Sequence, residues 1–345
     1  MRISAIGEFA LIERIRRMLP RPHDALLGIG DDCAALRPTV GRDLLLTTDL
    51  LVDEVDFTRQ TITPFRLGRK AMGVNLSDIA AMGGLPRAAL VALAIPPDEE
   101  IEFVDELYRG LREEGAQFSV EVIGGDLSAS STLMIGVTLV GEVEAGRVIT
   151  RSGARPGEQI WVTGRLGASA AGLMALKAGS RLLDNQVETP YEVSGSLREA
   201  IRQAIERHLC PIPRIREGRA LARAGVASAM IDLSDGLASD LAHLCRESGV
   251  SAKIREDQIP VDQAASAIAQ HFGQDPLALA LQGGEDFELL FTSSWDPADI
   301  AAMFPDAVTV TAVGKVWAAG HGCQIERRDG RAVALTGGYD HFWRQ

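Results

Sequence analysis

Apolar residues in the first half of the chain follow two different periodicities. Phe9, Ile12 and Ile15 recur at the spacing of one helical face, which predicts an amphipathic helix over residues 8–18. Short apolar runs without this spacing are typical of buried strands. On these criteria we expect further helices over 64–82 and 99–114, and strands over 44–48, 88–95, 120–123 and 132–143.

The second half of the chain begins after a polar linker. Residues 151–157 are rich in turn formers and make the best candidate for a domain boundary. A strand over 159–163 and a small-residue helix over 168–178 follow, and weak periodicity predicts a surface loop over 180–196. We therefore expect two domains, 1–150 and 151–345, each of the α/β (α+β) class.

Composition supports a two-domain globular protein and argues against nucleic acid as a partner. The chain has 345 residues, of which 46% are hydrophobic and 24% charged. This length corresponds to two domains at about 150 residues each. Lys and Arg number 35 against 47 Asp and Glu, so the net charge is −12. Binding to nucleic acid would require a basic face, which such a chain does not readily supply.

Cysteine usage and hydropathy predict a soluble, cytoplasmic protein. The four cysteines are widely spaced and form no CxxC pair, which is typical of reduced thiols inside the cell. No uncharged apolar run approaches the roughly 18 residues of a membrane span. A charged residue follows the N-terminus before a signal-peptide core could form. We therefore expect no membrane partner.

Several common catalytic signatures are missing. Gly314-Lys315 is followed by Val316, so it does not form the GxxxxGK[ST] loop that binds phosphate. Residues 28–32 lack the third glycine of a dinucleotide-binding motif and would place carboxylates against a pyrophosphate. Zinc-type spacing of Cys and His is absent, and so is the GxSxG elbow of hydrolases.

Aspartates recur at glycine-rich breaks and at the ends of predicted strands. They are Asp31, Asp32, Asp49, Asp78, Asp126, Asp232 and Asp235. Each lies where we expect a strand to end or a helix to begin, which is where α/β proteins place their sites. Any one of them could simply cap a helix or close a turn. As a group, however, carboxylates repel one another unless cations neutralise them.

The residue types indicate which cation and which substrate are involved. Oxygen ligands without His or Cys favour Mg²⁺, Mn²⁺ or Ca²⁺, and the missing EF-hand spacing makes Ca²⁺ the weaker choice. Mg²⁺ held by aspartates usually bridges to phosphate oxygens. The glycines of 124–126 and 283–286 would let a phosphate approach the backbone, although either segment could be a plain turn. These residues predict a Mg²⁺-dependent enzyme that acts on a phosphorylated substrate.

Short segments in a particular order span nearly the whole chain. They are 7–9, 28–32, 47–49, 75–83, 123–126, 150–153, 231–237, 283–286 and 338–342. Their order and spacing resemble the thiamine-monophosphate kinase family, in the superfamily that includes aminoimidazole ribonucleotide synthetase. The resemblance implies an N-terminal sheet-forming domain that binds ATP and Mg²⁺ and forms a homodimer, followed by a C-terminal α/β domain. It also implies direct transfer of the ATP γ-phosphate to thiamine monophosphate, giving thiamine diphosphate and ADP.

The resemblance assigns roles residue by residue. It implies Mg²⁺ ligands at Asp32, Thr47, Thr48, Asp49, Asp78, Asp126, Asp232 and Asp235. It implies ATP contacts at Gly125, Asp126, Arg151, Ser234 and Tyr108, and thiamine monophosphate contacts at Asp56, Glu285 and Tyr339. Some family members carry histidine where this chain has Asp56. Asp126, Asp232 and Arg151 are the expected catalytic residues, because positioning and charge neutralisation carry most phosphoryl transfers. Taken alone, Arg151 would be a solvated linker arginine and Tyr339 a packing residue.

Related families and a pure binding role are the alternatives. A selenophosphate synthetase would carry a reactive cysteine in a glycine-rich N-terminal segment, whereas Cys33 directly follows the metal motif. A hydrogenase-maturation dehydratase would end in cysteine, and this chain ends in Gln345. A purine-pathway synthetase stays open as an alternative, although the segment 338–342 does not support it. A non-catalytic module that binds Mg²⁺ and nucleotide also remains open, and turnover distinguishes it from a kinase.

Overall fold

The computed structural model of the chain describes residues 1–19, 25–29, 32–304 and 308–339. The chain forms two compact units. The first comprises Met1–Ile79 and Gly84–Gly146, and the second comprises Ala80–Gly83 and Arg147–Gln345. Each unit has its own main sheet. Among the described helices, none combines the length and the hydropathy that crossing a membrane requires.

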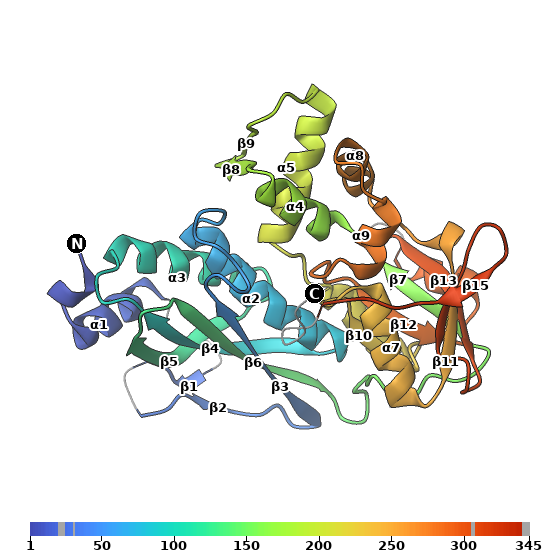
Figure 1. Cartoon of the computed structure of the whole chain (residues 1–345). Helices are drawn as coiled ribbons and strands as arrows, with labels where there is room; N and C mark the ends of the chain where they lie inside the picture. Colours follow the sequence, from blue (N-terminus) through green and yellow to red (C-terminus); the bar gives the residue numbers. More distant parts are fainter. Residues whose placement is uncertain (20–24, 30–31, 305–307, 340–345) are drawn as a thin grey trace. The chain divides into compact units, whose positions relative to one another are not determined.

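The first unit is built on a four-stranded sheet in the order β3-β6-β4-β5. The strands are β3 (Arg42–Val52), β4 (Leu85–Ile95), β5 (Glu121–Ala129) and β6 (Met134–Glu144). Only β4 and β5 are parallel, and they are joined through helix α3 (Ile101–Ala116), which supplies the crossover that a parallel pair needs. Helices α2 (Pro64–Ala81) and α3 cover one face of this sheet (Figure 1).

The remaining elements of the first unit are small. They are η1 (Ile3–Ala5), α1 (Glu8–Met18) and the short pair β1 (Ala25–Leu27) and β2 (Ala35–Leu36). Helix α1 presents Leu11 and Ile15 as its buried face. Its Arg14 forms an ion pair with Asp105 of α3, so the two helices are held together by polar as well as apolar contacts.

The second unit is built on a seven-stranded sheet in the order β10-β12-β7-β13-β11-β14-β15. The strands are β7 (Gln159–Thr163), β10 (Ala229–Asp232), β11 (Ser251–Arg255), β12 (Leu289–Ser293), β13 (Val310–Trp317), β14 (Cys323–Glu326) and β15 (Ala332–Ala334). Only β11 and β14 pair in parallel. Leu237, Leu241 and Leu244 of helix α7 (Leu237–Ser248) belong to the core cluster that also contains residues of these strands.

The other helices of the second unit lie between its strands in sequence. They are α4 (Ala168–Lys177), α5 (Gly195–Leu209), α6 (Ile215–Ala224), α8 (Gln263–His271), α9 (Pro276–Gln282) and α10 (Pro297–Ala302), with the single turn η2 (Glu256–Gln258). Helices α4, α5 and α8 stand together in Figure 1. A small hairpin, β8 (Arg181–Leu183) and β9 (Gln186–Glu188), follows α4.

Most of the expected elements are confirmed, as is the mixed α/β class of the fold. The helix predicted over 8–18 and the strand predicted over 159–163 match α1 and β7 residue for residue. Helices α2 and α3 lie within two residues of their predicted bounds. Strong local periodicity identifies these elements because each one buries a single regular face.

Two expectations about local structure are wrong. Asp49 and Asp126 lie inside β3 and β5, not at the strand ends where we expected them, whereas Asp78 lies inside α2, as the helix predicted over 64–82 requires. The strands continue because their partners do: the pairing of β3 with β6 runs to Val52, and that of β5 with β4 runs to Ala129. The surface loop expected over 180–196 instead contains the β8–β9 hairpin.

Candidate functional site

In the first unit, Asp49 and Asp78 come together on the sheet face that α2 covers. Thr47 Oγ1 donates a hydrogen bond to Asp78 of α2, and the Asp49 amide donates to Asn75 Oδ1 at 3.1 Å. Burial of the carboxylate, with the nearby charges of Asp78 and Asp56, raises the pKa of Asp49 to about 6. The charged form of Asp49 is therefore penalised, and a bound cation would remove that penalty.

Thr48 faces away from this group. Side chains alternate along a strand, so Thr48 points to the sheet face opposite to that of Thr47 and Asp49. On that face, Thr138 Oγ1 donates to Thr48 Oγ1 at 3.1 Å. Any contribution of Thr48 to an ion held by Asp49 would therefore come from its backbone carbonyl.

The other predicted site residues of the first unit are less closely grouped. Asp126 is exposed on the edge strand β5, opposite Ala92 of β4. A Cβ on the neighbouring Gly125 would lie 2.0 Å from the Val91 carbonyl oxygen, so this pairing requires glycine. Asp32 is exposed between β1 and β2. Tyr108 is only 4% exposed on α3, and burial raises the pKa of its phenol.

In the second unit, three segments meet beyond the C-terminal end of β10. The Glu285 amide donates to the Ser234 carbonyl at 2.8 Å, and the Tyr339 amide donates to the Asp235 carbonyl at 3.1 Å. A Cβ on Gly284 would lie 2.4 Å from the Ser234 oxygen, so only glycine permits the approach. The structure thus brings Ser234 and Asp235 to Glu285 and Tyr339, which lie far from them in sequence.

Asp240 is a site residue that the sequence analysis missed. It is buried in the first turn of α7 and accepts a hydrogen bond from the Asp235 amide at 3.1 Å. Burial, with the charges of Asp232 and Asp235, raises the pKa of Asp240 to about 8. A signal was present in the sequence, because Leu237, Leu241 and Leu244 place Asp240 beside the apolar face of its helix.

The donor atoms of both units suit a hard cation. Thr47, Asp49 and Asp78 supply oxygen atoms only, and so do Asp232, Asp235 and Asp240. In each group, burial together with the neighbouring carboxylates raises the pKa of one aspartate. Within the described residues, no three His, Cys, Asp or Glu side chains are arranged to hold a metal ion. Mg²⁺ keeps several waters and takes only one or two carboxylates from a protein, so these residues still fit it.

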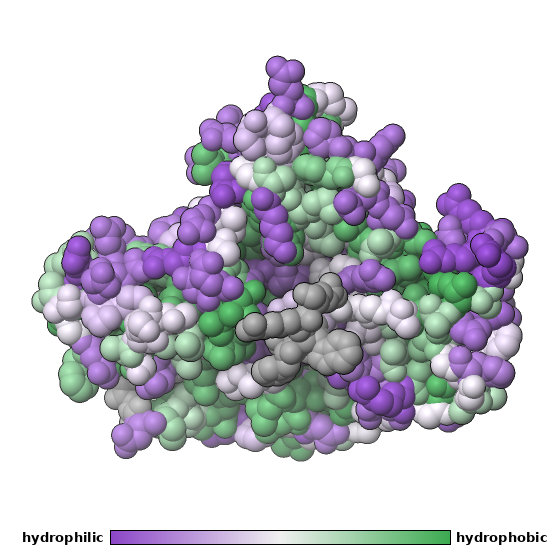
Figure 2. Space-filling view, in the orientation of Figure 1, coloured by the Kyte–Doolittle hydropathy of each residue, from purple (hydrophilic) through white to green (hydrophobic). Residues whose placement is uncertain are grey.

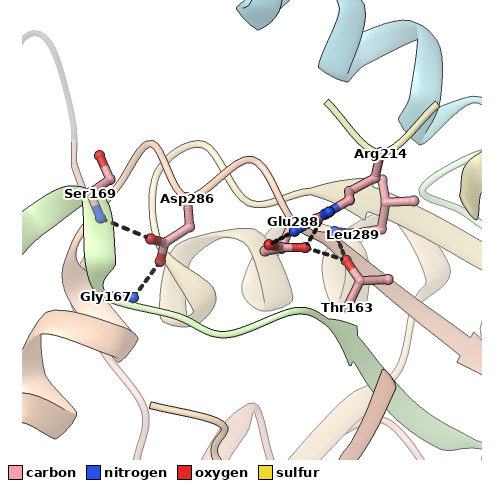
Figure 3. A network of polar contacts seen from close by, with 7 residues as sticks. All are labelled: Thr163, Gly167, Ser169, Arg214, Asp286, Glu288 and Leu289. Atoms are coloured by element: carbon pink, nitrogen blue, oxygen red, sulfur yellow. Dashed lines mark hydrogen bonds and ion pairs between the residues drawn. The ribbon is translucent and has the colours of Figure 1, made fainter. Parts of the chain in front are cut away.

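Asp286 anchors the loop that follows Glu285. Its carboxylate accepts hydrogen bonds from the amides of Gly167 at 2.7 Å and Ser169 at 3.3 Å, at the start of α4 (Figure 3). It thereby satisfies amides that have no partner within the helix. Burial raises the pKa of Asp286 to about 7, although both hydrogen bonds act in the opposite direction.

Glu288 anchors the other end of the same loop. It is buried, accepts from Thr163 Oγ1 at 2.7 Å and forms a two-point ion pair with Arg214, in which Nε lies 2.6 Å from Oε2 (Figure 3). Thr163 in turn accepts from the Leu289 amide at 2.8 Å. Glu285 is therefore carried by a loop that is fixed at Asp286 and at Glu288.

A pocket of about 240 Å³ lies beside this loop within the second unit. Its lining includes Arg165, Arg207, Arg214, Glu285, Asp286 and Glu288. The side chain of Glu285 is 29% exposed, and its backbone has a φ of +63°, a conformation uncommon for residues other than glycine. A strained backbone held in this way points to a site whose geometry matters.

Three predicted residues lie outside these groups or only partly within them. Arg151 is exposed, and its guanidinium makes no hydrogen bond or ion pair with any described residue. Asp56 accepts from the Val52 amide at 2.8 Å and lies near Asp49. Tyr339 is half exposed. Asp31 and 340–342 of the sequence motifs lie outside the described residues.

Comparisons with known proteins agree over nearly the whole chain. Residues 30–143 match the family model of the AIR synthase related protein, N-terminal domain, and residues 155–322 match that of its C-terminal domain. Thiamine-monophosphate kinase of Salmonella typhimurium is 39% identical over 347 residues, which cover 98% of this chain and 99% of that protein.

Two solved structures are similar in fold as well as in sequence. The crystal structure of thiamine-monophosphate kinase from Stenotrophomonas maltophilia K279a has a TM-score of 0.78 and 34% identity, covering 95% of this chain and 98% of that one. A structure of AaThiL complexed with AMPPCP and TMP has a TM-score of 0.75 and 35% identity, and covers 99% of each chain.

Proposed function

This chain belongs to the thiamine-monophosphate kinase family, and we propose on that basis that it transfers the γ-phosphate of ATP directly to thiamine monophosphate. The products are thiamine diphosphate and ADP. The observation that carries the proposal is the match to a kinase of this name over 98% of the chain. The second unit is compatible with it, because Ser234, assigned to ATP, is hydrogen-bonded through its backbone to Glu285, assigned to the acceptor.

Mg²⁺ is the proposed metal. Its ligands would be Asp32, Thr47, Thr48, Asp49, Asp78 and Asp126 in the first unit and Asp232 and Asp235 in the second. When bound, Mg²⁺ would neutralise phosphate oxygens that otherwise repel one another. The raised pKa values of Asp49 and Asp240 support this assignment, because buried carboxylates that lie near other carboxylates favour a cation.

The substrate contacts follow the chemistry of the two substrates. We assign ATP to Gly125, Asp126, Tyr108, Arg151 and Ser234, with Asp126, Asp232 and Arg151 as catalytic residues. Arginine can pair with two phosphate oxygens at once. We assign thiamine monophosphate to Asp56, Glu285 and Tyr339, because the thiazolium ring is cationic and suits carboxylates and an aromatic face. The pocket lined by Glu285 leaves room beside that residue.

The functional unit is proposed to be a homodimer formed through the first unit's sheet. Leu44, Leu46 and Leu50 of β3 are exposed, and Leu46 is 71% exposed. Figure 2 shows apolar surface, in green, where Figure 1 draws the lower end of β3. Exposed apolar patches of this kind mark interaction surfaces. We also propose a cytoplasmic location, because no disulfide joins cysteines in the part of the chain that the structure describes.

The direct test is product formation. The purified protein is incubated with ATP, Mg²⁺ and thiamine monophosphate, and thiamine diphosphate is measured by chromatography. Product should require both Mg²⁺ and the monophosphate, and free thiamine should not replace the monophosphate. ATP binding without product would instead favour a non-catalytic nucleotide-binding module.

Replacing Glu285 with Ala is expected to raise KM for thiamine monophosphate about tenfold and to leave KM for ATP within about twofold. The carboxylate that would face the cationic ring is removed, while the Ser234 backbone contact remains. Steady-state kinetics with each substrate varied in turn measures the effect. Glu247→Ala, at an exposed position on α7, is the matched control. A rise confined to KM for ATP would refute the substrate assignment.

Replacing Leu46 with Asp is expected to shift the protein from dimer to monomer. A charge on the apolar face of β3 would have to be desolvated in the dimer. Sedimentation velocity at several protein concentrations measures the species present. Leu183→Asp places the same charge at an exposed leucine of the second unit and should leave the dimer intact. An unchanged dimer in the Leu46 variant would exclude this sheet face as the interface.

A further inference from the structure

His208 lies behind Glu285 in the second unit and has no role in the function proposed above. It belongs to the last turn of α5 and is 6% exposed. Its Nδ1 atom lies 3.1 Å from Glu285 Oε2 and 3.0 Å from Ser169 Oγ. A buried imidazole is thus in contact with Glu285, one of the loop residues that line the pocket.

The chemistry of the three groups defines which atom donates. An ionised carboxylate can only accept hydrogen bonds, so the contact with Glu285 is attractive only when Nδ1 carries a hydrogen. The Ser169 hydroxyl can accept from the same nitrogen, because a hydroxyl oxygen has two lone pairs. The hydrogen-bond network therefore assigns a protonated Nδ1 to His208.

Glu285 is held through its side chain by His208. Its backbone is fixed by the hydrogen bond to Ser234 and by the anchoring of Asp286 and Glu288 on α4 and Arg214. The side chain, however, is partly exposed and has three rotatable bonds. Ordering a flexible carboxylate before the substrate arrives lowers the entropy cost of binding.

The contact that orients Glu285 is itself supported from the same loop. Asp286 accepts from the Ser169 amide at 3.3 Å and so holds the first turn of α4. Ser169 then contacts His208, which contacts Glu285. Asp286 therefore holds Ser169 in place at the start of α4, and Ser169 contacts the histidine that holds Glu285.

We propose that His208 is a positioning residue that orients the Glu285 carboxylate toward the cationic ring of thiamine monophosphate, and that Ser169 orients His208. This inference rests on the proposed function, because it presupposes that Glu285 contacts the acceptor. It predicts that His208 affects binding of the acceptor and not binding of ATP.

A pair of substitutions of similar size separates a polar role from packing. In His208→Asn, the amide nitrogen can take the place of Nδ1 as a donor, whereas His208→Leu has no donor. We expect His208→Leu to raise KM for thiamine monophosphate about tenfold and to leave KM for ATP within about twofold. His208→Asn should remain within about threefold of the wild-type protein for both substrates. His243→Leu, at a histidine of α7 that contacts Arg246, is the control.

The combination with Glu285→Ala tests whether His208 acts through Glu285. If it does, His208→Leu should have no further effect on KM for thiamine monophosphate in the Glu285→Ala background. Multiplicative effects of the two substitutions, or equal effects of Asn and Leu at position 208, would overturn the inference while the kinase activity stands. If the wild-type protein forms no thiamine diphosphate, the proposed function fails and the inference fails with it.

A measurement on the free protein tests the contact itself. The imidazole ¹⁵N signals of His208, assigned by comparison with His208→Asn, should move when Glu285 is replaced by Gln, because the charged acceptor of Nδ1 is lost. The signals of His243 should not move. An unchanged His208 signal would overturn the contact on which the inference stands.

Discussion

Replacing Asp126 with Asn is expected to lower kcat by at least about 100-fold without unfolding the protein. Asp126 is exposed on the edge strand β5, and Asn has nearly the same shape, so the change costs little packing. What it removes is a negative charge proposed to hold Mg²⁺ against the transferred phosphate. The loss should appear in kcat for thiamine diphosphate formation at saturating ATP, thiamine monophosphate and Mg²⁺.

The Asp98→Asn variant is the matched control for this effect. Asp98 is also exposed in the first unit, just after β4, and no ligand role is assigned to it. Circular dichroism of both variants during heating should overlay that of the wild-type protein. Wild-type turnover in the Asp126 variant would remove this residue from the catalytic group.

Replacing Arg214 with Ala is expected to lower the free energy of unfolding of the second unit by about 3–5 kcal/mol. Arg214 and Glu288 are both buried and form a two-point ion pair. Without the guanidinium, the Glu288 carboxylate stays buried, and the Thr163 hydroxyl is its one remaining side-chain partner among the described residues. A buried charge without compensation is costly. Urea unfolding followed by tryptophan fluorescence reports this unit, because Trp161, Trp295 and Trp317, the tryptophans among the described residues, all belong to it.

Two further variants identify the cause of that loss. Arg202→Ala breaks an exposed ion pair with Glu199 in the same unit and should cost no more than about 1 kcal/mol. Replacing Arg214 with Met and Glu288 with Leu together should recover much of the stability, since no charge is then left buried. If Arg214→Ala lowered the free energy of unfolding as little as Arg202→Ala does, the buried ion pair would not stabilise this loop.

Local pattern was sufficient for elements that bury one regular face. The spacing of apolar residues predicted helix α1 and strand β7. The two aspartates of the segment 232–235 marked it as a candidate site. These features are encoded within a few neighbouring residues, because a helix repeats every 3.6 residues and a strand every two. The exclusion of a P-loop and of a zinc site is equally local, since it depends on short motifs.

The lengths of the strands depended on pairing with distant segments. Asp49 and Asp126 lie inside β3 and β5 because Val52 pairs with Met134 and Ala129 pairs with Ile95. Nothing near Asp49 or Asp126 in the sequence carries that register. Likewise, side chains alternate along β3, so Thr48 lies on the opposite face of the sheet from Thr47. The residue types alone do not show which face each threonine occupies.

The roles of Asp240, Asp286, Glu288 and His208 became visible only through their neighbours in space. Aspartate, glutamate and histidine are common in surface positions, and their sequence context does not tell whether a side chain is buried or which group it meets. Burial and partner are properties of packing between segments far apart in the chain, such as Ser169 with His208 and Ser234 with Glu285. The amino-acid sequence thus specified which chemical groups are available to this kinase. Long-range packing decided which of these groups interact, because electrostatic and hydrogen-bond energies depend on distance and burial.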